Sequence, residues 1–321
     1  MIRETLISFI VLCLVFWGCG HQENTANKKS NRSNNQSTQS IIQVKIGIES
    51  DQISQAWKKA IQNRVTKSTL DSLSQLTKKI SPQEKQWIQL IQSKTKKWNA
   101  LRDSLRVPFE HIVLNDTIYV LLGYQGGNDG FTYQHNTVCF DVASLYKAYG
   151  SAQDSINRNR IDRIYSHEFT HLLHKAWKTK NRLKLTNFKD SVLWECIYEG
   201  IGMYRSMSSR WFPQKGQLSS AAQATFKNLY PEFTHNIIDV LTKSTFSDLE
   251  KKKIKAHLSR GSLNKKWGAM PVAVWLALES NGNDKNLIQW VNKGPEATLL
   301  LGNKYLKGKN KTQFEKAVQR Q

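Results

Sequence analysis

Acidic residues are scarce in this sequence of 321 residues. It contains 25 Asp and Glu residues against 47 Lys and Arg residues, which gives a formal net charge of +22. The basic residues are scattered along the chain and no motif that reads nucleic-acid bases accompanies them, so no nucleic-acid partner is predicted. The charge favours acidic partners or anionic envelope lipids in general, although an ordinary basic surface explains it more simply.

Cysteine is rarer still, with four residues in the whole chain. Cys13 and Cys19 lie near the start, which leaves Cys139 and Cys196 for the folded region and allows at most one disulfide there. Both are flanked by apolar residues. A Cys139–Cys196 disulfide in an oxidising compartment and two buried free thiols therefore both fit the sequence.

The start of the chain lacks a run long enough to span a membrane. Residues 1–18 have a short polar beginning and a short apolar core, which predicts a signal peptide. The next residue, Cys19, follows a glycine as at a lipoprotein cleavage site, so we expect it to become the lipid-modified N-terminus. Residues 19–40 are rich in Asn, Ser, Gln and Lys, which predicts a disordered tether. These features predict a lipid-anchored protein of the cell envelope, on the outer membrane or periplasmic face, or a secreted protein if Cys19 is not lipidated.

The most informative motif is His-Glu-Phe-Thr-His at residues 167–171. Two histidines four residues apart lie on one face of a helix, so both imidazoles reach the same metal ion. Apolar residues recur at helical spacing through the surrounding segment, which places the motif on an amphipathic helix. The pattern predicts a Zn²⁺ site with His167 and His171 as ligands and Glu168 as general base toward a zinc-activated water. Two incidental histidines on a helix surface are the alternative.

A catalytic zinc site needs a third protein ligand and an open position for water. The candidate stretch is residues 193–204, which reads as a second helix with Glu195 and Glu199 on one face. A carboxylate within so apolar a run is costly to bury unless it is paired or bound to a metal. We therefore expect at least one of the two to be a ligand, and two solvent-facing glutamates are the alternative.

These two segments resemble the gluzincin superfamily of zinc metallopeptidases, in which a glutamate on a second helix follows the His-Glu-x-x-His helix. Residues 199–204, Glu-Gly-Ile-Gly-Met-Tyr, are similar to the Glu-Gly-x-Ala-x-Tyr segment of the aminopeptidase-like branch. That match implies Glu199 as the third ligand. The thermolysin-like pattern Glu-x-x-x-Asp would instead imply Glu195, with Glu199 supporting a histidine. The chain also resembles uncharacterised bacterial lipoproteins described as predicted zinc-dependent proteases, and the resemblance covers about residues 110–205.

Two related patterns are absent. Metzincins need a glycine and a third histidine after the motif, and His174 stands too early for that role. Aminopeptidases carry an upstream exopeptidase motif, and residues 123–130 have its glycines without its pattern. Aminopeptidase specificity is therefore not predicted.

The order of expected elements predicts an α+β fold, with a small, mostly antiparallel sheet followed by a mainly helical lobe that carries both metal-binding helices. Strands are expected over 112–114 and 118–122, joined by an Asn115-Asp116 hairpin turn, and over 137–141. Helices are expected over 50–67, 69–79, 82–106, 158–178, 190–208 and, as the most apolar one, 267–280.

No internal repeat divides residues 41–321, which we interpret as one metallopeptidase-like domain. Its parts are a helical N-terminal part (41–106), a zinc-site core (107–210) and a helical C-terminal part (211–321).

The gluzincin resemblance has two further implications. The strand before the zinc helix, residues 137–141, would be an edge strand at the cleft that pairs with an extended substrate. A Tyr or His would stabilise the oxyanion. Tyr204, Tyr230 and His235 are candidates, with Tyr204 preferred, although a structural role is the simpler interpretation of each.

Together these predictions describe an envelope-anchored zinc metallopeptidase that acts on a peptide or protein substrate. A catalytically inactive zinc-binding, assembly or adhesion lipoprotein and a hydrolase of a non-peptide amide are the alternatives. The intact Glu168 favours an enzyme over an inactive relative, since loss of the base is the simplest route to an inactive site. Nothing in the sequence indicates an oligomeric state.

Overall fold

A computed structural model describes residues 41–320 of the chain except 50–51, 76, 78, 115–116 and 215. The described residues belong to one compact unit, Gln39–Gln321. The predicted signal peptide, Cys19 and the tether lie outside the described residues, as does the expected Asn115-Asp116 turn. Within the described ranges, no helix combines the length and hydrophobicity needed to cross a bilayer.

The main sheet has four strands in the order β1-β4-β6-β5. Its strands β1, β4 and β6 run parallel to one another, and β5 is antiparallel to β6. The α+β class and the small sheet are confirmed, but the sheet is mixed rather than mostly antiparallel. These four strands are β1 (Ile41–Ile46), β4 (Thr117–Gly123), β5 (Gly130–Tyr133) and β6 (Thr137–Asp141); a separate antiparallel pair is formed by β2 (Ile48–Glu49) and β3 (Gln52–Ile53).

The predicted hairpin of 112–114 with 118–122 is wrong. Residues 112–114 form no strand, and β4 pairs on its two sides with β1 and β6. The strand β1 lies at the start of the segment expected to be helical. Parallel strands need a long crossover connection, which helices α1 to α4 supply here, and local turn chemistry carries no information about such a distant pairing.

The expectation that residues 137–141 form the edge strand is also wrong. This segment is β6, which lies between β4 and β5 and is buried along its whole length. The two edge strands are β1 and β5, and β5, which follows the glycine-rich loop, is the one that packs against α6. A run that is apolar throughout is typical of a strand covered on both faces, and the sequence pattern does not show which neighbours it pairs with.

The sheet is covered on both faces. Phe131 of β5 and Cys139 of β6 are directly opposite one another, so they share one face, and the neighbouring Phe140 points to the other. Trp57 of α1 lies with its ring centroid 5.6 Å from that of Phe131, and Trp98 of α4 lies 5.9 Å from Phe140. Helices α1 and α4 therefore pack on opposite faces.

The helix expected over 50–67 is shorter than predicted and covers only Gln55–Ile61, while Ser81 and Glu84 form a capping box at the start of the helix that follows them. The single helix expected over 82–106 is divided at Lys94, where α3 ends and α4 begins. These helices are α1 (Gln55–Ile61), α2 (Lys67–Gln75), α3 (Pro82–Ser93) and α4 (Thr95–Arg106).

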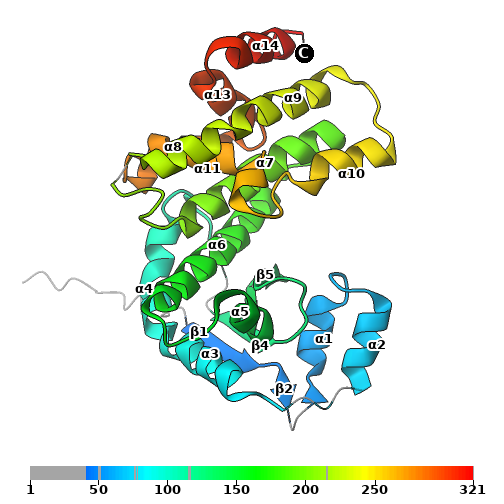
Figure 1. Ribbon diagram of the computed structural model, residues 1–321, viewed down its shortest axis with the longest axis vertical. Helices are drawn as coiled ribbons and strands as arrows, with labels where there is room; N and C mark the ends of the chain where they lie inside the picture. Colours follow the sequence, from blue (N-terminus) through cyan, green and yellow to red (C-terminus); the bar gives the residue numbers. More distant parts are fainter. Residues whose placement is uncertain are drawn as a thin grey trace, which may run out of the picture. The chain divides into compact units, whose positions relative to one another are not determined.

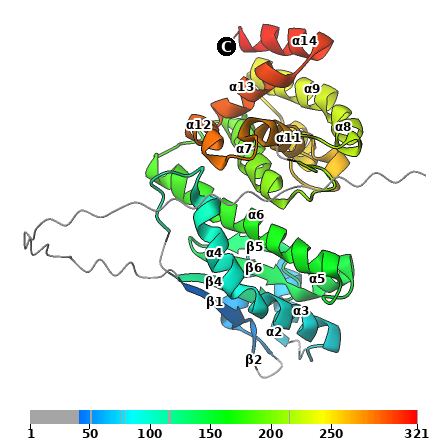
Figure 2. The same cartoon turned by 90° about the vertical axis from the view of Figure 1, so that its left-hand side faces the viewer.

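Helix α6 (Ser155–Lys180) packs on β5 and β6 and also against α7 (Phe188–Ser206), so it joins the sheet to the helical part of the unit (Figure 1). Helix α7 has few polar positions on any side because it is covered by α6 and by α11 (Ala269–Ser280), which is buried along most of its length. The remaining helices are α8 (Ser220–Lys227), α9 (Leu229–Thr242), α10 (Asp248–Ala256), α12 (Ile288–Lys293), α13 (Glu296–Tyr305) and α14 (Gly308–Val318), while α5 (Val142–Tyr149) packs on the sheet. Figure 2 shows α9 and α13 packed near α7 and α11, with α14 beyond them, and the other helices complete this part of the unit.

Candidate metal centre

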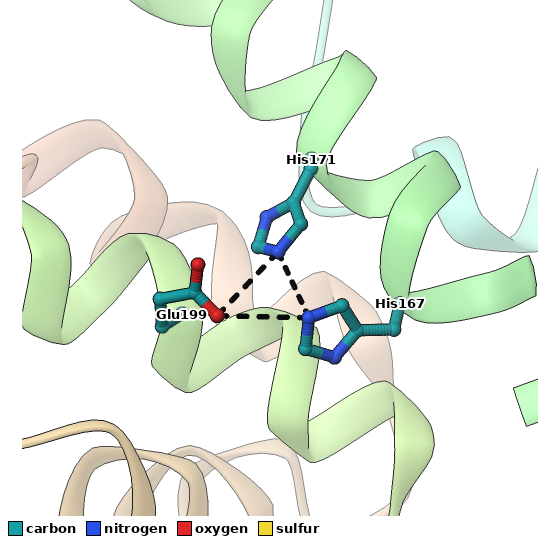
Figure 3. Close-up of side chains that lie close together, drawn as sticks. All are labelled: His167, His171 and Glu199. Carbon is teal, nitrogen blue, oxygen red and sulfur yellow. Dashed lines mark hydrogen bonds and ion pairs between the residues drawn. The ribbon is translucent and has the colours of Figure 1, made fainter. Parts of the chain in front are cut away.

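Helices α6 and α7 bring three metal-ligating side chains together (Figure 3). His167 and His171, one turn apart on α6, point their Nε2 atoms toward each other at 2.9 Å. The Oε2 atom of Glu199 on α7 lies 3.6 Å from each Nε2. Among the described residues this is the one group of three or more His, Cys, Asp or Glu side chains whose ligand atoms gather closely enough for a metal ion.

The geometry and chemistry of this cluster fit zinc. Zinc binds histidine nitrogen and carboxylate oxygen at about 2.0–2.2 Å in tetrahedral sites, which places neighbouring ligand atoms roughly 3.3 Å apart. The three separations found here, 2.9, 3.6 and 3.6 Å, bracket that value. Two nitrogens and one oxygen form the ligand set of a catalytic site that keeps a fourth position for water or substrate.

The two imidazoles lie directly against the backbone of α7 at Gly202. A Cβ atom at this position would come within 3.0 Å of Cε1 of both His167 and His171. A glycine here lets α7 approach α6 closely enough for Glu199 to reach the histidines. The second glycine of the Glu-Gly-Ile-Gly segment, Gly202, is therefore required because a side chain there would clash with the two imidazoles.

The charges of the cluster are coupled. Burial alone would raise the pKa of Glu199, but the facing His171 and His167 hold it well below its usual range. Burial alone would lower the pKa of His167, but the carboxylates of Glu199 and Glu168 raise it above its usual range. Glu199 is thus held ionised, the form in which it binds a metal cation.

Tyr198 supports His171 from α7. Its ring is stacked on the imidazole, with centroids 4.1 Å apart and planes inclined by 13°. Burial, together with the charges of Glu199 and Glu168, raises the pKa of its hydroxyl well above the usual range, while the Thr132 side chain of β5 opposes that rise. Sequence reasoning missed Tyr198, since a tyrosine in an apolar helix reads as a core residue.

Glu168 is placed beside the edge strand. Its side chain is 8% exposed, and its Oε1 lies within 3.6 Å of the position that a Cβ at Gly130 would take. A Cβ at Gly130 would also come within 2.8 Å of the Ile164 side chain, so the glycine lets β5 lie closely against α6. The predicted base thus lies where α6 packs against β5.

The alternative third ligand, Glu195, lies outside the cluster. Its Oε1 accepts a hydrogen bond of 2.8 Å from the Ser259 hydroxyl, and burial raises its pKa above the usual range. The one-turn difference between the two glutamates on α7 is what brings Glu199 rather than Glu195 to the histidines.

The residues suggested for oxyanion stabilisation have other neighbours. The Tyr204 hydroxyl lies 2.9 Å from Oδ1 of Asp284 and 3.0 Å from Oγ of Ser280, in contacts between α7 and the end of α11. Tyr230 stacks on Trp275, with centroids 5.8 Å apart. His235 is largely exposed and lies beside Asp239. None of these contacts involves the metal cluster, so the role assigned to Tyr204 stays a prediction.

His174 is a core residue one turn beyond His171. It is fully buried, its two ring nitrogens have no hydrogen-bond partner in the described part of the chain, and burial with the neighbouring His171 lowers its pKa to about 3. Aromatic rings surround it, which are those of Phe109, Trp177, Trp194 and Tyr198. A neutral imidazole here serves packing, and His174 takes no part in the metal cluster.

Three cations face the cluster, one from α6 itself and two from distant parts of the sequence. Lys266 precedes α11, and its Nζ lies 3.5 Å from the sulfur of Met203. Lys175 of α6 hydrogen-bonds the Thr132 hydroxyl of β5, and Arg64 follows α1. The charges of all three act on Glu168. No local sequence signal distinguishes them from the other lysines and arginines, because only the fold brings these segments together.

The two cysteines of the folded region are both buried and free. Burial raises the pKa of the Cys139 and Cys196 thiols above the usual range. The hypothetical bridge between β6 and α7 is thus not formed, and the alternative of two buried free thiols holds in this structure.

The comparisons with known proteins agree with this centre. A family model described as "Putative zinc dependent peptidase (DUF5700)" matches residues 25–308 of the chain. No curated protein and no solved structure matches it.

Proposed function

This chain belongs to the DUF5700 family, whose description is zinc-dependent peptidase. We propose that it is a zinc metallopeptidase with His167, His171 and Glu199 as the metal ligands. The observation that carries the proposal is the position of Glu199, whose Oε2 is 3.6 Å from both histidine Nε2 atoms. A metal held there lies beside Glu168, the adjacent acidic side chain on α6.

Zinc, when bound, supplies a Lewis acid that activates water and polarises the peptide carbonyl. Glu168 accepts the proton of the attacking water and later delivers it to the leaving amine. Its position beside Gly130 places this proton transfer next to the edge strand. His171 is kept in orientation by its stack on Tyr198.

The open edge of β5 supports the binding of an extended peptide. An edge strand presents unpaired backbone groups, and a peptide that adds to it as a further strand satisfies them. The substrate-pairing role first assigned to residues 137–141 passes in this proposal to β5, since β6 is interior. The scissile bond would then lie beside Gly130 and Glu168.

We assign oxyanion stabilisation to Lys266. This partly buried ammonium has the sulfur of Met203 as its hydrogen-bond acceptor, and its charge acts on Glu199, Asp129 and Glu168. Burial lowers its pKa below the usual range. A preorganised cation at the site stabilises the negative charge that develops on the carbonyl oxygen.

The proposal extends to the location of the enzyme. The short apolar leader, Cys19 and the polar residues 19–40 support attachment to the cell envelope by an N-terminal lipid, with the peptidase unit held away from the membrane. Metabolic labelling with a radioactive fatty acid tests this part. Label on the wild-type protein and none on Cys19→Ala is the expected result, and equal labelling of the two would contradict it.

The test of the activity uses the full chain loaded with zinc and a mixed peptide library analysed by mass spectrometry. We expect about one zinc per chain, cleavage by the wild-type protein, and no cleavage by Glu168→Gln, which should keep its zinc. Removal of zinc with a chelator should abolish cleavage, and added zinc should restore it. A protein that binds zinc but cleaves no peptide would support an inactive binding protein instead, and a protein that binds no zinc would contradict the metal centre.

A further inference from the structure

The two faces of β5 carry a cation each, beside the edge that remains open. On the α1 face the guanidinium of Arg64 lies 4.1 Å from the centroid of the Phe131 ring and donates from Nε to the Gly126 carbonyl at 3.3 Å. On the α6 face the ammonium of Lys175 donates to the Thr132 hydroxyl. Phe131 and Thr132 are consecutive residues of β5, so their side chains point to opposite faces.

Neither cation forms an ion pair with a carboxylate among the described residues. No acidic side chain in the described part of the chain lies within 4.0 Å of Arg64 or Lys175 as an ion pair, whereas many other basic residues of this protein do form such pairs. Their contacts are a backbone carbonyl oxygen, the side-chain amide oxygen of Asn128, an aromatic ring and a hydroxyl. Lys175 also lies outside the last turn of α6, where Lys178 and Lys180 already complement the helix dipole.

The metal centre does not neutralise these charges. In the zinc-loaded site the two positive charges of the ion are balanced by the carboxylates of Glu199 and Glu168. The carboxylate of Asp129 acts on Lys266, whereas Arg64 and Lys175 keep their positive charges beside the centre. A partly desolvated cleft with this excess of positive charge attracts anionic groups and repels cationic ones.

The positive region continues past the end of β5. A groove of about 600 Å³ begins at Lys175 and follows the C-terminal end of α6. No acidic residue lines it. Its basic lining residues are His135, Lys175, Lys178, Arg182 and Lys184.

We infer that the substrates are acidic peptides, in which two consecutive residues that pair with β5 carry carboxylate side chains. An added strand alternates its side chains between the two faces, as β5 does. The residue opposite Phe131 therefore reaches Arg64, and its neighbour opposite Thr132 reaches Lys175. Further acidic residues along the same peptide would lie in the basic groove. This inference rests on the proposed function, because the peptide must lie along β5 beside Glu168.

The test measures binding and cleavage separately. Binding of fluorescent peptides to full-length, zinc-loaded Glu168→Gln is followed by anisotropy, and cleavage by the wild-type enzyme is followed as kcat/KM. Each cleavable sequence is made with adjacent Asp or Glu residues and with the matching Asn or Gln residues. We expect about a tenfold preference for each carboxylate, with a ratio that falls as salt is raised from 20 to 500 mM, because exposed charges are screened.

Two variants test which cation is responsible for the preference for a carboxylate at each of the two peptide positions. Arg64→Gln should lower the acid-to-amide ratio about tenfold at one of the two peptide positions, and Lys175→Met should lower it at the neighbouring position. The matched control is Lys180→Met, since Lys180 lies on the same helix and donates to the His111 carbonyl instead. The ratio compares two peptides on one variant, so it is independent of general losses of activity.

The outcomes separate this inference from the proposed function. Tight, charge-dependent peptide binding without cleavage would support the acidic specificity and contradict the peptidase. Cleavage with an acid-to-amide ratio near one, or with a ratio that neither variant changes, would overturn the acidic specificity and leave the peptidase. Binding of vesicles of anionic phospholipid in place of acidic peptides would also overturn it, as the basic groove would then be a lipid-binding surface.

Discussion

The imidazole of His171 is stacked on the ring of Tyr198, with the centroids 4.1 Å apart and the planes 13° from parallel. The two residues belong to different helices, α6 and α7, and Tyr198 directly precedes Glu199. One turn of α7 thus carries both a proposed metal ligand, Glu199, and the ring that orients another proposed ligand, His171. The buried Nδ1 of His171 has no hydrogen-bond partner in the described residues, so the stack is its main orienting contact.

This relationship predicts that the ring of Tyr198, rather than its hydroxyl, maintains zinc affinity. Tyr198→Leu should raise the Kd for zinc about tenfold, in the range found for residues that support metal ligands. Tyr198→Phe keeps the stacked ring and should leave the Kd within a factor of about two to three. Competition with a zinc-chelating dye measures both constants. A large loss of affinity in the Phe variant would assign the support to the hydroxyl instead.

Substitution of Gly202 should impair metal binding through the imidazoles. The new methyl group in Gly202→Ala would lie 3.0 Å from Cε1 of His167 and of His171. We expect the displaced rings to weaken zinc binding about tenfold or more.

The matched control on the same helix is Gly200→Ala. Its methyl group would come within 2.5 Å of Val272 on α11 and would disturb the packing of the two helices. We expect it to lower the free energy of unfolding of the zinc-free protein by about 1–3 kcal/mol. Equal effects of the two variants on zinc affinity would indicate that general loosening of α7 is responsible.

The two glutamates of α7 should differ in their effect on metal content. Glu199→Ala removes the carboxylate that faces both histidines and should abolish stoichiometric zinc binding. Glu195→Ala removes a side chain that is hydrogen-bonded to Ser259 and should leave about one zinc per chain. Elemental analysis after dialysis distinguishes the two, and loss of zinc in the Glu195 variant alone would shift the ligand set by one helical turn.

Lys266 should affect the chemical step more than substrate binding. Lys266→Met is expected to lower kcat about 100-fold, with KM changed only a few-fold, as for other groups that stabilise a developing oxyanion. The zinc content should stay at one per chain. The exposed neighbour Lys265 supplies the control, and Lys265→Met should behave as the wild type. An increase in KM with unchanged kcat would instead assign Lys266 to substrate binding.

His174 should make the protein sensitive to acid. The unfolded chain protonates this side chain near its ordinary pKa of 6.5, whereas burial lowers its pKa to about 3 in the folded state. The unfolded state therefore binds more protons between these values, and the free energy of unfolding falls as the pH decreases through this window. Well below pH 6.5, this one group lowers the free energy of unfolding by about 1.4 kcal/mol for each unit by which the pH falls.

Urea unfolding of the zinc-free protein between pH 4 and 7 measures this dependence. His174→Leu should show a flatter pH profile than the wild type by that amount. Parallel profiles of the wild type and His174→Leu would show that His174 does not contribute to acid sensitivity.

Much of the metal centre was predictable because its signals are local. The spacing of His167 and His171 places both on one face of α6 whatever surrounds the helix. The capping box at Ser81 and the apolar run of α11 are equally local, and the structure contains both. The α+β class followed from the order of such segments along the chain.

The helices and the pair of histidines follow from the sequence alone, because they depend on contacts within a few residues. That Glu199 rather than Glu195 reaches the histidines follows from the packing of the helices, since it depends on how closely α7 approaches α6 at Gly202. The same holds for the place of β5 at an edge of the sheet and for the meeting of Arg64 and Lys266 with Lys175 beside Glu168. Strand order and the meeting of distant charges are non-local, and periodicity along the chain carries no information about them.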